Sequence, residues 1–196
     1  MDSTPMDRAD MLAALEQAGA VMSGHFVLTS GRHSGMYVQC ARILEDPKLT
    51  TRLAETIAHR VSDLDVDIVA APAVGGILIG FAVAQALGVK FIFSERVEGE
   101  MVFRRSFTIE PGARVLVVED VVTTGGSIEE VITLVRRAGG EPVGVASLID
   151  RGGERAFGGV YMPLLQLEVE SWEPESCALC AAGEAVDSPG SRRLGG

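Results

Sequence analysis

The chain has 196 residues, of which 47% are hydrophobic and 22% charged, and its formal net charge is −10. This length fits a single domain, which we expect over residues 1–182, followed by a disordered tail over 183–196. The negative charge argues against a nucleic-acid-binding surface. No apolar run is long enough to cross a membrane, no secretory signal opens the chain, and three cysteines do not suit a disulfide framework, so we expect a cytoplasmic protein.

The first sixty residues predict two helices with a hairpin between them. Residues 6–18 carry apolar side chains at helical spacing. Residues 25–40, HFVLTSGRHSGMYVQC, contain two β-prone pieces around a Gly-rich turn, which indicates a hairpin. A helix is expected over 47–61, because Pro47 is well placed in a first turn.

From residue 67 the pattern changes to short apolar runs, typical of strands buried on both faces of a parallel sheet. These runs are DIVAAP (67–72), KFIFSE (90–95), RVLVVED (114–120) and PVGVASLID (142–150), with a further candidate strand over 164–169. Helices are expected at 75–87 and 125–138, and the charged link 94–111 predicts a hairpin or mobile loop. The alternation predicts an α/β fold, a central and mostly parallel sheet flanked by helices, with ligands at the carboxyl ends of the strands.

The segment 115–127, VLVVEDVVTTGGS, has the most specific pattern. An apolar strand brings Glu119 and Asp120 to its carboxyl end, and a Thr-Gly-rich turn then opens a helix. Free N–H groups at a helix start receive a phosphate, and the two carboxylates upstream can accept hydrogen bonds from ribose hydroxyls. A capped helix after a buried strand would explain the turn but not the acids, because burying an unpartnered carboxylate is costly. The spacing therefore predicts a sugar-phosphate site.

This segment resembles the ribose-phosphate loop of the type I phosphoribosyltransferases, which bind 5-phosphoribosyl-1-pyrophosphate (PRPP). The resemblance implies that the acids hold the ribose 2′ and 3′ hydroxyls and that the turn binds the 5′-phosphate. It also extends to the turn at 71–76, which is similar to the family's loop for the diphosphate. The PRPP-binding residues implied are Ala73, Val74, Gly75, Glu119, Asp120, Val121, Val122, Thr123, Thr124, Gly125, Gly126 and Ser127.

Three further segments resemble the orotate phosphoribosyltransferases. The SGRHS sequence at 30–34 is similar to the segment that covers the acceptor base, the link 94–111 corresponds to the mobile lid, and SLIDRGG places an arginine where the family pairs one with orotate. The resemblance runs from about residue 8 to 172 and implies a small N-terminal hood over 6–40. It implies orotate binding by Tyr37, Thr123 and Arg151, because an arginine fork suits a planar acid.

The resemblance implies an enzyme that transfers the phosphoribosyl group of PRPP to orotate, giving orotidine 5′-monophosphate and pyrophosphate in pyrimidine biosynthesis. It implies Mg²⁺ held mainly by substrate and water, with no direct side-chain ligand, and a homodimer. Glu119, Asp120 and the lid residue Arg96 are the implied catalytic residues. Two open alternatives are a phosphoribosyltransferase for a purine or other base and a non-catalytic regulator that senses PRPP.

The sequence departs from the orotate family at two places. Thr29 stands where many members have a lysine before Ser-Gly-Arg, and the lid lacks the usual lysines and histidine. Its charged residues are Glu95, Arg96, Glu98, Glu100, Arg104 and Arg105. Which of these arginines replaces the lysine that stabilises the leaving diphosphate does not follow from the sequence, and each also fits a solvated loop charge.

Cys177 and Cys180 form a lone CxxC near the C-terminal end. Structural zinc normally needs four ligands, and Cys40 with three scattered histidines does not obviously complete a set. A plain turn is therefore the favoured interpretation, with a metal site, including one shared between two chains, as the alternative. The three histidines also lack the spacing to a Ser or Cys nucleophile that would predict a catalytic triad.

Overall fold

The computed structural model of the protein describes residues 4–28, 30–153 and 155–189. Its body is a six-stranded sheet in the order β5-β4-β3-β6-β7-β8, and every neighbouring pair except β4 with β5 is parallel. The strands are β3 (Ile68–Pro72), β4 (Lys90–Val97), β5 (Glu100–Phe103), β6 (Arg114–Val122), β7 (Glu141–Asp150) and β8 (Val160–Gln166). The predicted α/β class with a mostly parallel sheet is confirmed.

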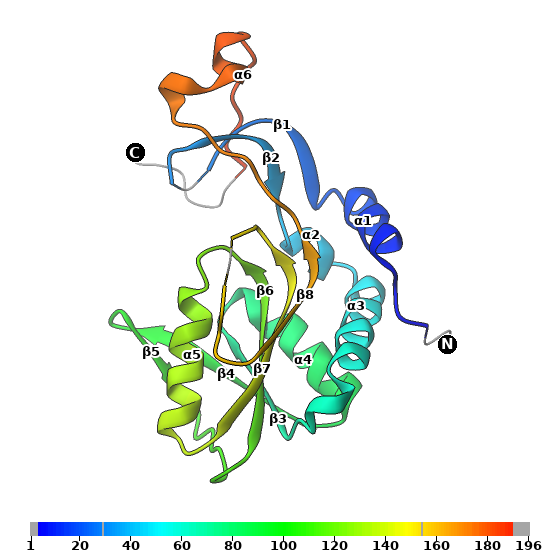
Figure 1. Ribbon diagram of the computed structural model, residues 1–196, viewed down its shortest axis with the longest axis vertical. Helices are drawn as coiled ribbons and strands as arrows, with labels where there is room; N and C mark the ends of the chain where they lie inside the picture. The colour runs from blue at the N-terminus through cyan, green and yellow to red at the C-terminus, as the bar shows by residue number, and fades with distance from the viewer. Residues whose placement is uncertain (1–3, 29, 154, 190–196) are drawn as a thin grey trace.

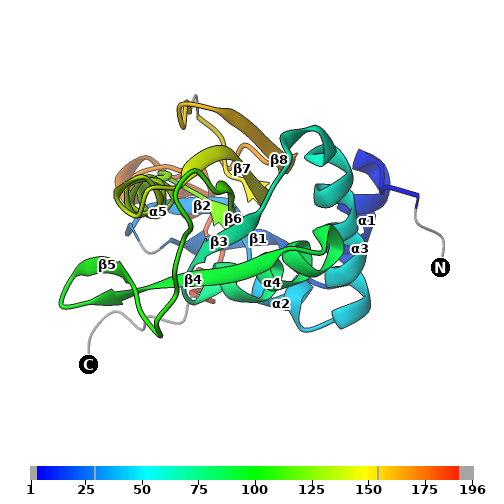
Figure 2. The same ribbon diagram turned by 90° about the horizontal axis from the view of Figure 1, so that it is seen from below.

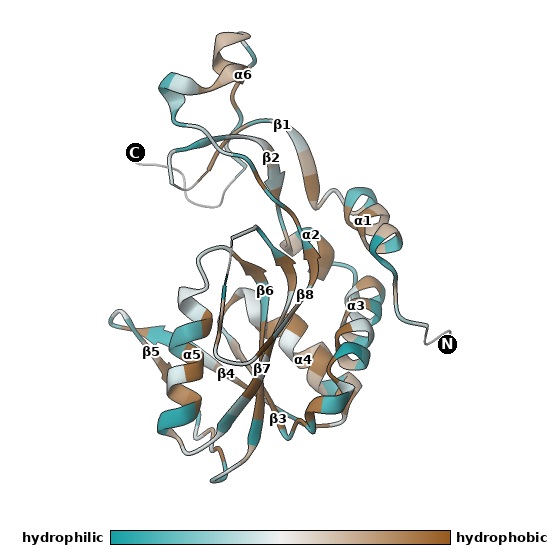
Figure 3. Cartoon of the chain, viewed as in Figure 1, coloured by the Kyte–Doolittle hydropathy of each residue, from teal (hydrophilic) through white to brown (hydrophobic). Residues whose placement is uncertain are grey.

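Helices cover both faces of this sheet. On one side lie α1 (Arg8–Gln17), α2 (Ala41–Leu44), α3 (Pro47–Arg60) and α4 (Gly75–Leu87), and on the other lies α5 (Gly126–Arg137) (Figure 1). Each face of the sheet packs against its helices to form a separate hydrophobic core. Because side chains alternate between the faces of a strand, Leu116 and Val118 of β6 pack in the core on the side of α1–α4, while Val115 and Val117 pack in the core on the side of α5. Figure 3 shows this pattern: hydrophobic residues predominate in the central strands, and the helices carry both hydrophobic and hydrophilic residues.

The carboxyl ends of the parallel strands face a smaller unit. We keep the name hood for this unit, although its residues differ from the expected range 6–40. It consists of the antiparallel hairpin of β1 (Val21–Val27) and β2 (His33–Val38) together with the C-terminal segment 167–189 (Figure 1). That segment includes α6 (Ala178–Ala181), preceded by the short 3₁₀ turn Pro174–Ser176. On the sheet edge away from β8, β4 and β5 form a hairpin that projects from the body (Figure 2).

Most predicted elements are confirmed within two or three residues of their bounds, and the link 94–111 does contain a hairpin. The short helices α2 and α6 were not predicted. In the described part of the expected tail, 183–189, the Asp187 carbonyl accepts a hydrogen bond from the Val27 N–H at 2.9 Å, and the Asp187 N–H donates one to the His25 carbonyl at 2.8 Å. Residues 190–196 and Thr29 lie outside the described residues. None of the helices in the described ranges has both the length and the apolar character that a membrane span requires.

Candidate active site

The two acids lie at the carboxyl end of β6, as the sequence predicts. Glu119 is buried and Asp120 is half-buried. The Asp120 N–H donates to Glu119 Oε1 at 3.2 Å, and the Val121 N–H donates to Asp120 Oδ1 at 2.8 Å. Burial, and then the negative charge of Asp120, raise the pKa of Glu119 to about 9. Burial and the neighbouring acid thus favour the protonated form of Glu119 in the absence of a ligand.

The Thr-Gly-rich turn forms a small hollow directly after the acids. Gly125 has φ +84°, a conformation that favours glycine, and α5 begins at the next residue. The hollow has a volume of about 40 Å³, more than one water needs. It is lined by Glu119, Val121, Val122, Thr123, Thr124, Gly125, Gly126, Ser127 and Ile128. A concave turn at the positive end of a helix dipole is the arrangement that binds a phosphate group.

The second predicted loop lies against the acid pair. α4 begins at Gly75, and a Cβ atom on Gly76 would lie 3.1 Å from the Val118 carbonyl and 3.2 Å from Glu119 Oε1. Val74 is 83% exposed, so its backbone is accessible from solvent. Ala73 does not fit its predicted role as a backbone donor to PRPP, because its N–H already donates to the Ser94 carbonyl at 2.8 Å. The exposed residues of this loop are therefore Val74 and Gly75, while Gly76 is buried.

The predicted orotate residues come from three different elements and lie close together. The Arg151 N–H donates to the Val122 carbonyl at 3.0 Å, which fixes this residue at the end of β7 beside the acid strand. Burial lowers the pKa of Arg151, while the neighbouring Tyr37 and Cys40 raise it. Burial, and then the charges of Asp120 and Glu119, raise the pKa of the Cys40 thiol. Tyr37 and Arg151 thus border the same space as the acid pair.

The SGRHS sequence holds the hood together in this structure. Arg32 donates to the Ser171 hydroxyl at 2.9 Å and pairs with Glu173, and the Ser34 hydroxyl donates to the Glu170 carbonyl at 2.7 Å. These contacts all fasten the hairpin to the C-terminal segment. The hairpin that the resemblance assigns to the acceptor base is therefore fastened to the C-terminal segment.

The predicted catalytic residue Arg96 lies near the end of β4. It belongs to the hairpin of β4 and β5, which we call the lid hairpin because it overlaps the predicted lid at 94–111. Its guanidinium donates to the Gly99 carbonyl and pairs with Glu130 on α5. Arg105 pairs with Glu95 at 2.9 Å and lies over the Phe93 ring, 5.4 Å from its centroid. Arg96 and Arg105 are therefore engaged at the side of the molecule, and neither contacts the acid pair among the described residues.

The sequence prediction missed an ion pair that supports the Thr-Gly-rich turn at 123–127, which we call the phosphate turn after its predicted ligand. Asp150, the last residue of β7, is almost fully buried and pairs with Arg155. The Arg155 guanidinium also donates to the carbonyls of Thr123 and Gly152. It therefore connects the end of β7 to the first residue of the turn. An acid that ends an apolar strand, as in SLIDRGGER, was the available signal for such a role.

The chain matches known proteins along almost its whole length. A phosphoribosyl transferase domain matches residues 40–158. Orotate phosphoribosyltransferase from Desulforamulus reducens is 47% identical over 96% of this chain and 100% of its own length, and that from Thermotoga maritima is 46% identical over 92% and 97%. The crystal structure of orotate phosphoribosyltransferase from Aeropyrum pernix is 28% identical, with a TM-score of 0.68 over 81% of this chain and 94% of its own.

These matches agree with the geometry of this structure, in which the acid pair, the phosphate turn and Arg151 lie at one edge of the sheet. The fold is that of the type I phosphoribosyltransferases, and the chain belongs to the orotate phosphoribosyltransferase family.

Proposed function

We propose that this protein transfers the phosphoribosyl group of PRPP to N1 of orotate, forming orotidine 5′-monophosphate and pyrophosphate. One observation carries this proposal. The acid pair of β6 lies between the phosphate turn on one side and the start of α4 on the other, so one PRPP molecule can contact all three at once. Arg151 is the cationic side chain beside this position and suits the carboxylate of orotate.

The reaction breaks the bond between C1′ and the diphosphate oxygen, which leaves with the bonding electrons, and forms a bond between C1′ and N1 of orotate, whose proton leaves to the diphosphate or to water. Positive charge develops on the ribose, and the carboxylates of Glu119 and Asp120, hydrogen-bonded to the ribose hydroxyls, lie on the side where they stabilise it. The N–H groups of the phosphate turn hold the 5′-phosphate, and those of Val74 and Gly75 hold the diphosphate. No side-chain nucleophile is required, because positioning and electrostatics supply the rate.

We include Mg²⁺ in the proposal because the site offers oxygen donors. The carboxylates of Glu119 and Asp120 are oxygen donors, the kind this ion prefers, but the burial of Glu119 suits contact through ribose hydroxyls better than direct ligation. When bound with PRPP, the ion would neutralise charge on the diphosphate. The acids and the phosphate turn bind and orient the sugar.

We propose a homodimer, supported by the outer face of α4. Val74, Leu78 and Phe81 are 83%, 57% and 57% exposed, which places three large apolar side chains beside the diphosphate loop. A patch of this kind marks an interaction surface. Light scattering should give twice the mass of the chain, and Phe81→Glu should lower the measured mass toward that of a single chain.

We also propose the cytoplasm as the compartment, in line with three cysteines that form no disulfide among the described residues.

The activity is tested by mixing the protein with Mg²⁺ and PRPP and following the loss of orotate absorbance, with adenine, hypoxanthine and uracil as controls. Only orotate should be consumed. The double variant Glu119→Gln with Asp120→Asn should lose orders of magnitude in turnover while its circular dichroism stays that of the folded protein. Consumption of a purine alone, or an unchanged rate in the double variant, would refute the assignment.

A further inference from the structure

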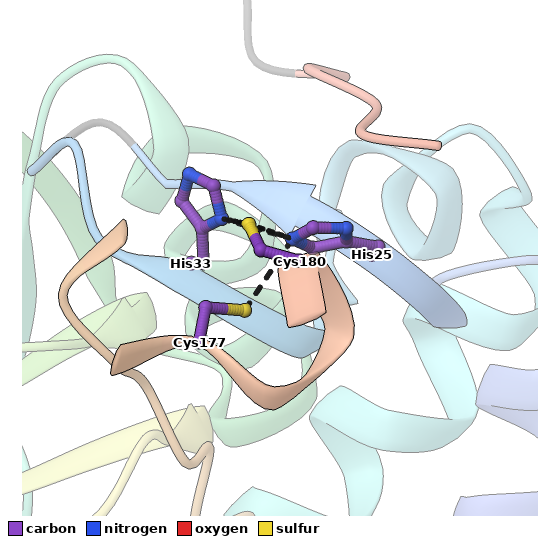
Figure 4. A group of neighbouring side chains, drawn as sticks. All are labelled: His25, His33, Cys177 and Cys180. Atoms are coloured by element: carbon purple, nitrogen blue, oxygen red, sulfur yellow. Dashed lines mark hydrogen bonds between the residues drawn. The ribbon is translucent and has the colours of Figure 1, made fainter. Parts of the chain in front are cut away.

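A group of four side chains in the hood has a geometry that the transfer reaction does not use. His25 on β1 and His33 on β2 converge with Cys177 and Cys180, the CxxC pair beside and within α6 (Figure 4). Each residue offers one ligand atom, a ring nitrogen of the histidines or the Sγ of the cysteines, and these four atoms all lie within 4.8 Å of one another. The expectation that the scattered histidines complete no four-ligand set is therefore wrong, because His25 and His33 lie beside the two cysteines.

We propose that His25, His33, Cys177 and Cys180 bind one structural Zn²⁺ that fastens the C-terminal segment to the β1–β2 hairpin. Two thiolates and two imidazoles form a ligand set typical of structural zinc, and the C-x₂-C spacing is common in such sites. The harder ions Mg²⁺ and Ca²⁺ prefer oxygen ligands. Four protein ligands leave no open position, so the site is structural rather than catalytic.

The distances between the ligand atoms fit a tetrahedral ion. Zn–N bonds of about 2.0–2.1 Å and Zn–S bonds of about 2.3 Å separate the ligands of a tetrahedral site by about 3.3–3.8 Å. His25 Nε2 lies 3.5 Å from Cys177 Sγ and 3.6 Å from Cys180 Sγ, and His33 Nδ1 lies 3.2 Å from Cys180 Sγ. The two ring nitrogens are 2.9 Å apart, slightly closer than the ideal edge. A small outward rotation of one ring brings them to the ideal spacing.

The hydrogen bond on the far side of His25 gives its ring the protonation state that a ligand requires. Nδ1 lies 3.0 Å from the carbonyl oxygen of Glu184. A carbonyl only accepts, so Nδ1 carries the proton and the lone pair is on Nε2, which points at the two sulfurs. Metal-bound histidines are oriented by this kind of partner. Because Glu184 follows α6, the same segment supplies both thiols and the carbonyl that orients His25.

Burial separates this cluster from surface residues that are close by chance. His25 is 3% exposed, His33 8% and Cys177 3%, while Cys180 lies at the surface and closes the outer side. Without a cation, His25 Nε2 and His33 Nδ1 share a single hydrogen bond, and sulfur atoms also face these two nitrogens. A bound ion satisfies all four groups together.

The hood needs such a link because its tip has little core. Of the described residues, those at 22–35 and 170–189 contribute no side chain to either of the two buried clusters of the body. An isolated two-stranded hairpin is marginally stable, and small units are often completed by a metal. The C-terminal segment runs along both edges of the hairpin, with His33 and Trp172 exchanging two hydrogen bonds of 2.8 Å and Asp187 bonded beside β1. Zn²⁺ would join both strands to this segment at one point.

The link also bears on the acceptor side of the active site, a consequence that rests on the proposed function. β2 carries both His33 and Tyr37, so loosening of the hood at the metal disturbs the strand that borders Arg151. We expect loss of the ion to raise KM for orotate more than KM for PRPP. Metal content and thermal stability are read independently of this effect, so the two proposals fail separately.

The first test uses the purified wild-type chain. Elemental analysis should find one zinc per chain, and replacement by Co²⁺ should give the visible absorption of tetrahedral cobalt bound to thiolates. A zinc-selective chelator, with Mg²⁺ kept in excess, should lower Tm. A protein that neither contains zinc nor takes up Zn²⁺ or Co²⁺ would instead hold a metal-free pair of hydrogen-bonded histidines, which overturns the proposal. Stoichiometric iron would overturn the choice of metal.

The second test assigns the ligands. Cys180→Ser, at an exposed position that tolerates the change in the fold, should lose at least ten-fold in zinc affinity and lower Tm to the chelated value. His59→Gln, which replaces the exposed histidine of α3 outside the cluster, should keep one zinc per chain and the wild-type Tm. Full zinc content in Cys180→Ser would contradict the proposed ligand set.

Discussion

A Cβ atom added to Gly75 would lie 2.7 Å from each carboxylate oxygen of Asp120. A side chain at residue 75 would require the Asp120 carboxylate to move, so the glycine lets α4 begin against the end of β6 with Asp120 in its present position. The contact places the diphosphate loop and the ribose-binding acids at one point, although 45 positions separate them in the chain.

Gly75→Ala should therefore damage PRPP binding. The added methyl group forces Asp120 away from its position, and we expect KM for PRPP to rise at least ten-fold with little change in the far-ultraviolet circular dichroism. Gly159→Ala is the matched control, because its Cβ would lie no closer than 3.7 Å to any atom and the residue is far along the chain from both loops. Equal KM values in the two variants would show that the close approach of Gly75 has no role.

Glu119 should make the protein less stable as the pH rises. Burial and Asp120 raise its folded-state pKa from 4.5 to about 9, so between these values the folded protein binds more protons than the unfolded chain. The free energy of unfolding then falls as the pH rises through this window. Gln at this position cannot ionise, so the stability of Glu119→Gln relative to the wild type should increase between about pH 5 and pH 9.

Urea denaturation of both proteins at several pH values across that window measures this difference. Glu16→Gln on α1, where the carboxylate is exposed, controls for the change in charge. A difference between Glu119→Gln and the wild type that stays flat with pH would mean that Glu119 is ionised in the folded protein.

The local pattern of the chain is sufficient to predict the body of the fold. β6 is a continuous apolar run that ends in two acids, and such a run is stable only as a strand buried on both faces. α4 follows from the Gly-Gly start and the Gly88 that ends it with φ +72°. The phosphate turn is equally local, since its glycines, hydroxyls and acids all lie within nine positions.

Contacts between distant segments were not predictable in the same way. His25 and Cys177 are 152 positions apart, and nothing in either local sequence indicates that the C-terminal segment returns to the hairpin. The use of the Ala73 N–H by Ser94 depends on the pairing of β3 with β4, and the contact of Arg96 with Glu130 depends on where the lid hairpin lies against α5. These are properties of packing, which a single sequence does not state.

Removal of Arg155 should destabilise both the fold and the phosphate turn. Arg155→Ala leaves the buried carboxylate of Asp150 without its partner, which we expect to lower the free energy of unfolding by about 3 kcal/mol. It also removes the donor to the Thr123 carbonyl, so KM for PRPP should rise. Chemical denaturation and steady-state kinetics measure the two effects.

The matched control is an exposed ion pair. Arg42 and Glu45 lie 3.3 Å apart with both side chains more than half exposed, and Arg42→Ala should cost no more than about 0.5 kcal/mol. In a double-mutant cycle, Asp150→Asn should recover part of the stability lost in Arg155→Ala, because it removes the buried unpaired charge. Additive losses would mean that the two residues do not act on each other.

Arg96 should be the lid residue that matters for catalysis, and Glu130 should hold it away from the acids in the ligand-free protein. If closure of the lid moves Arg96 from Glu130 toward the leaving diphosphate, Arg96→Gln removes a cation needed in the transition state and should lower kcat by at least ten-fold. Glu130→Gln weakens only the resting contact, so kcat should stay at the wild-type value or rise. Steady-state kinetics of both variants, with Arg105→Gln as the matched lid arginine that pairs with Glu95, separates these roles. A larger loss in Arg105→Gln than in Arg96→Gln would transfer the catalytic role to Arg105.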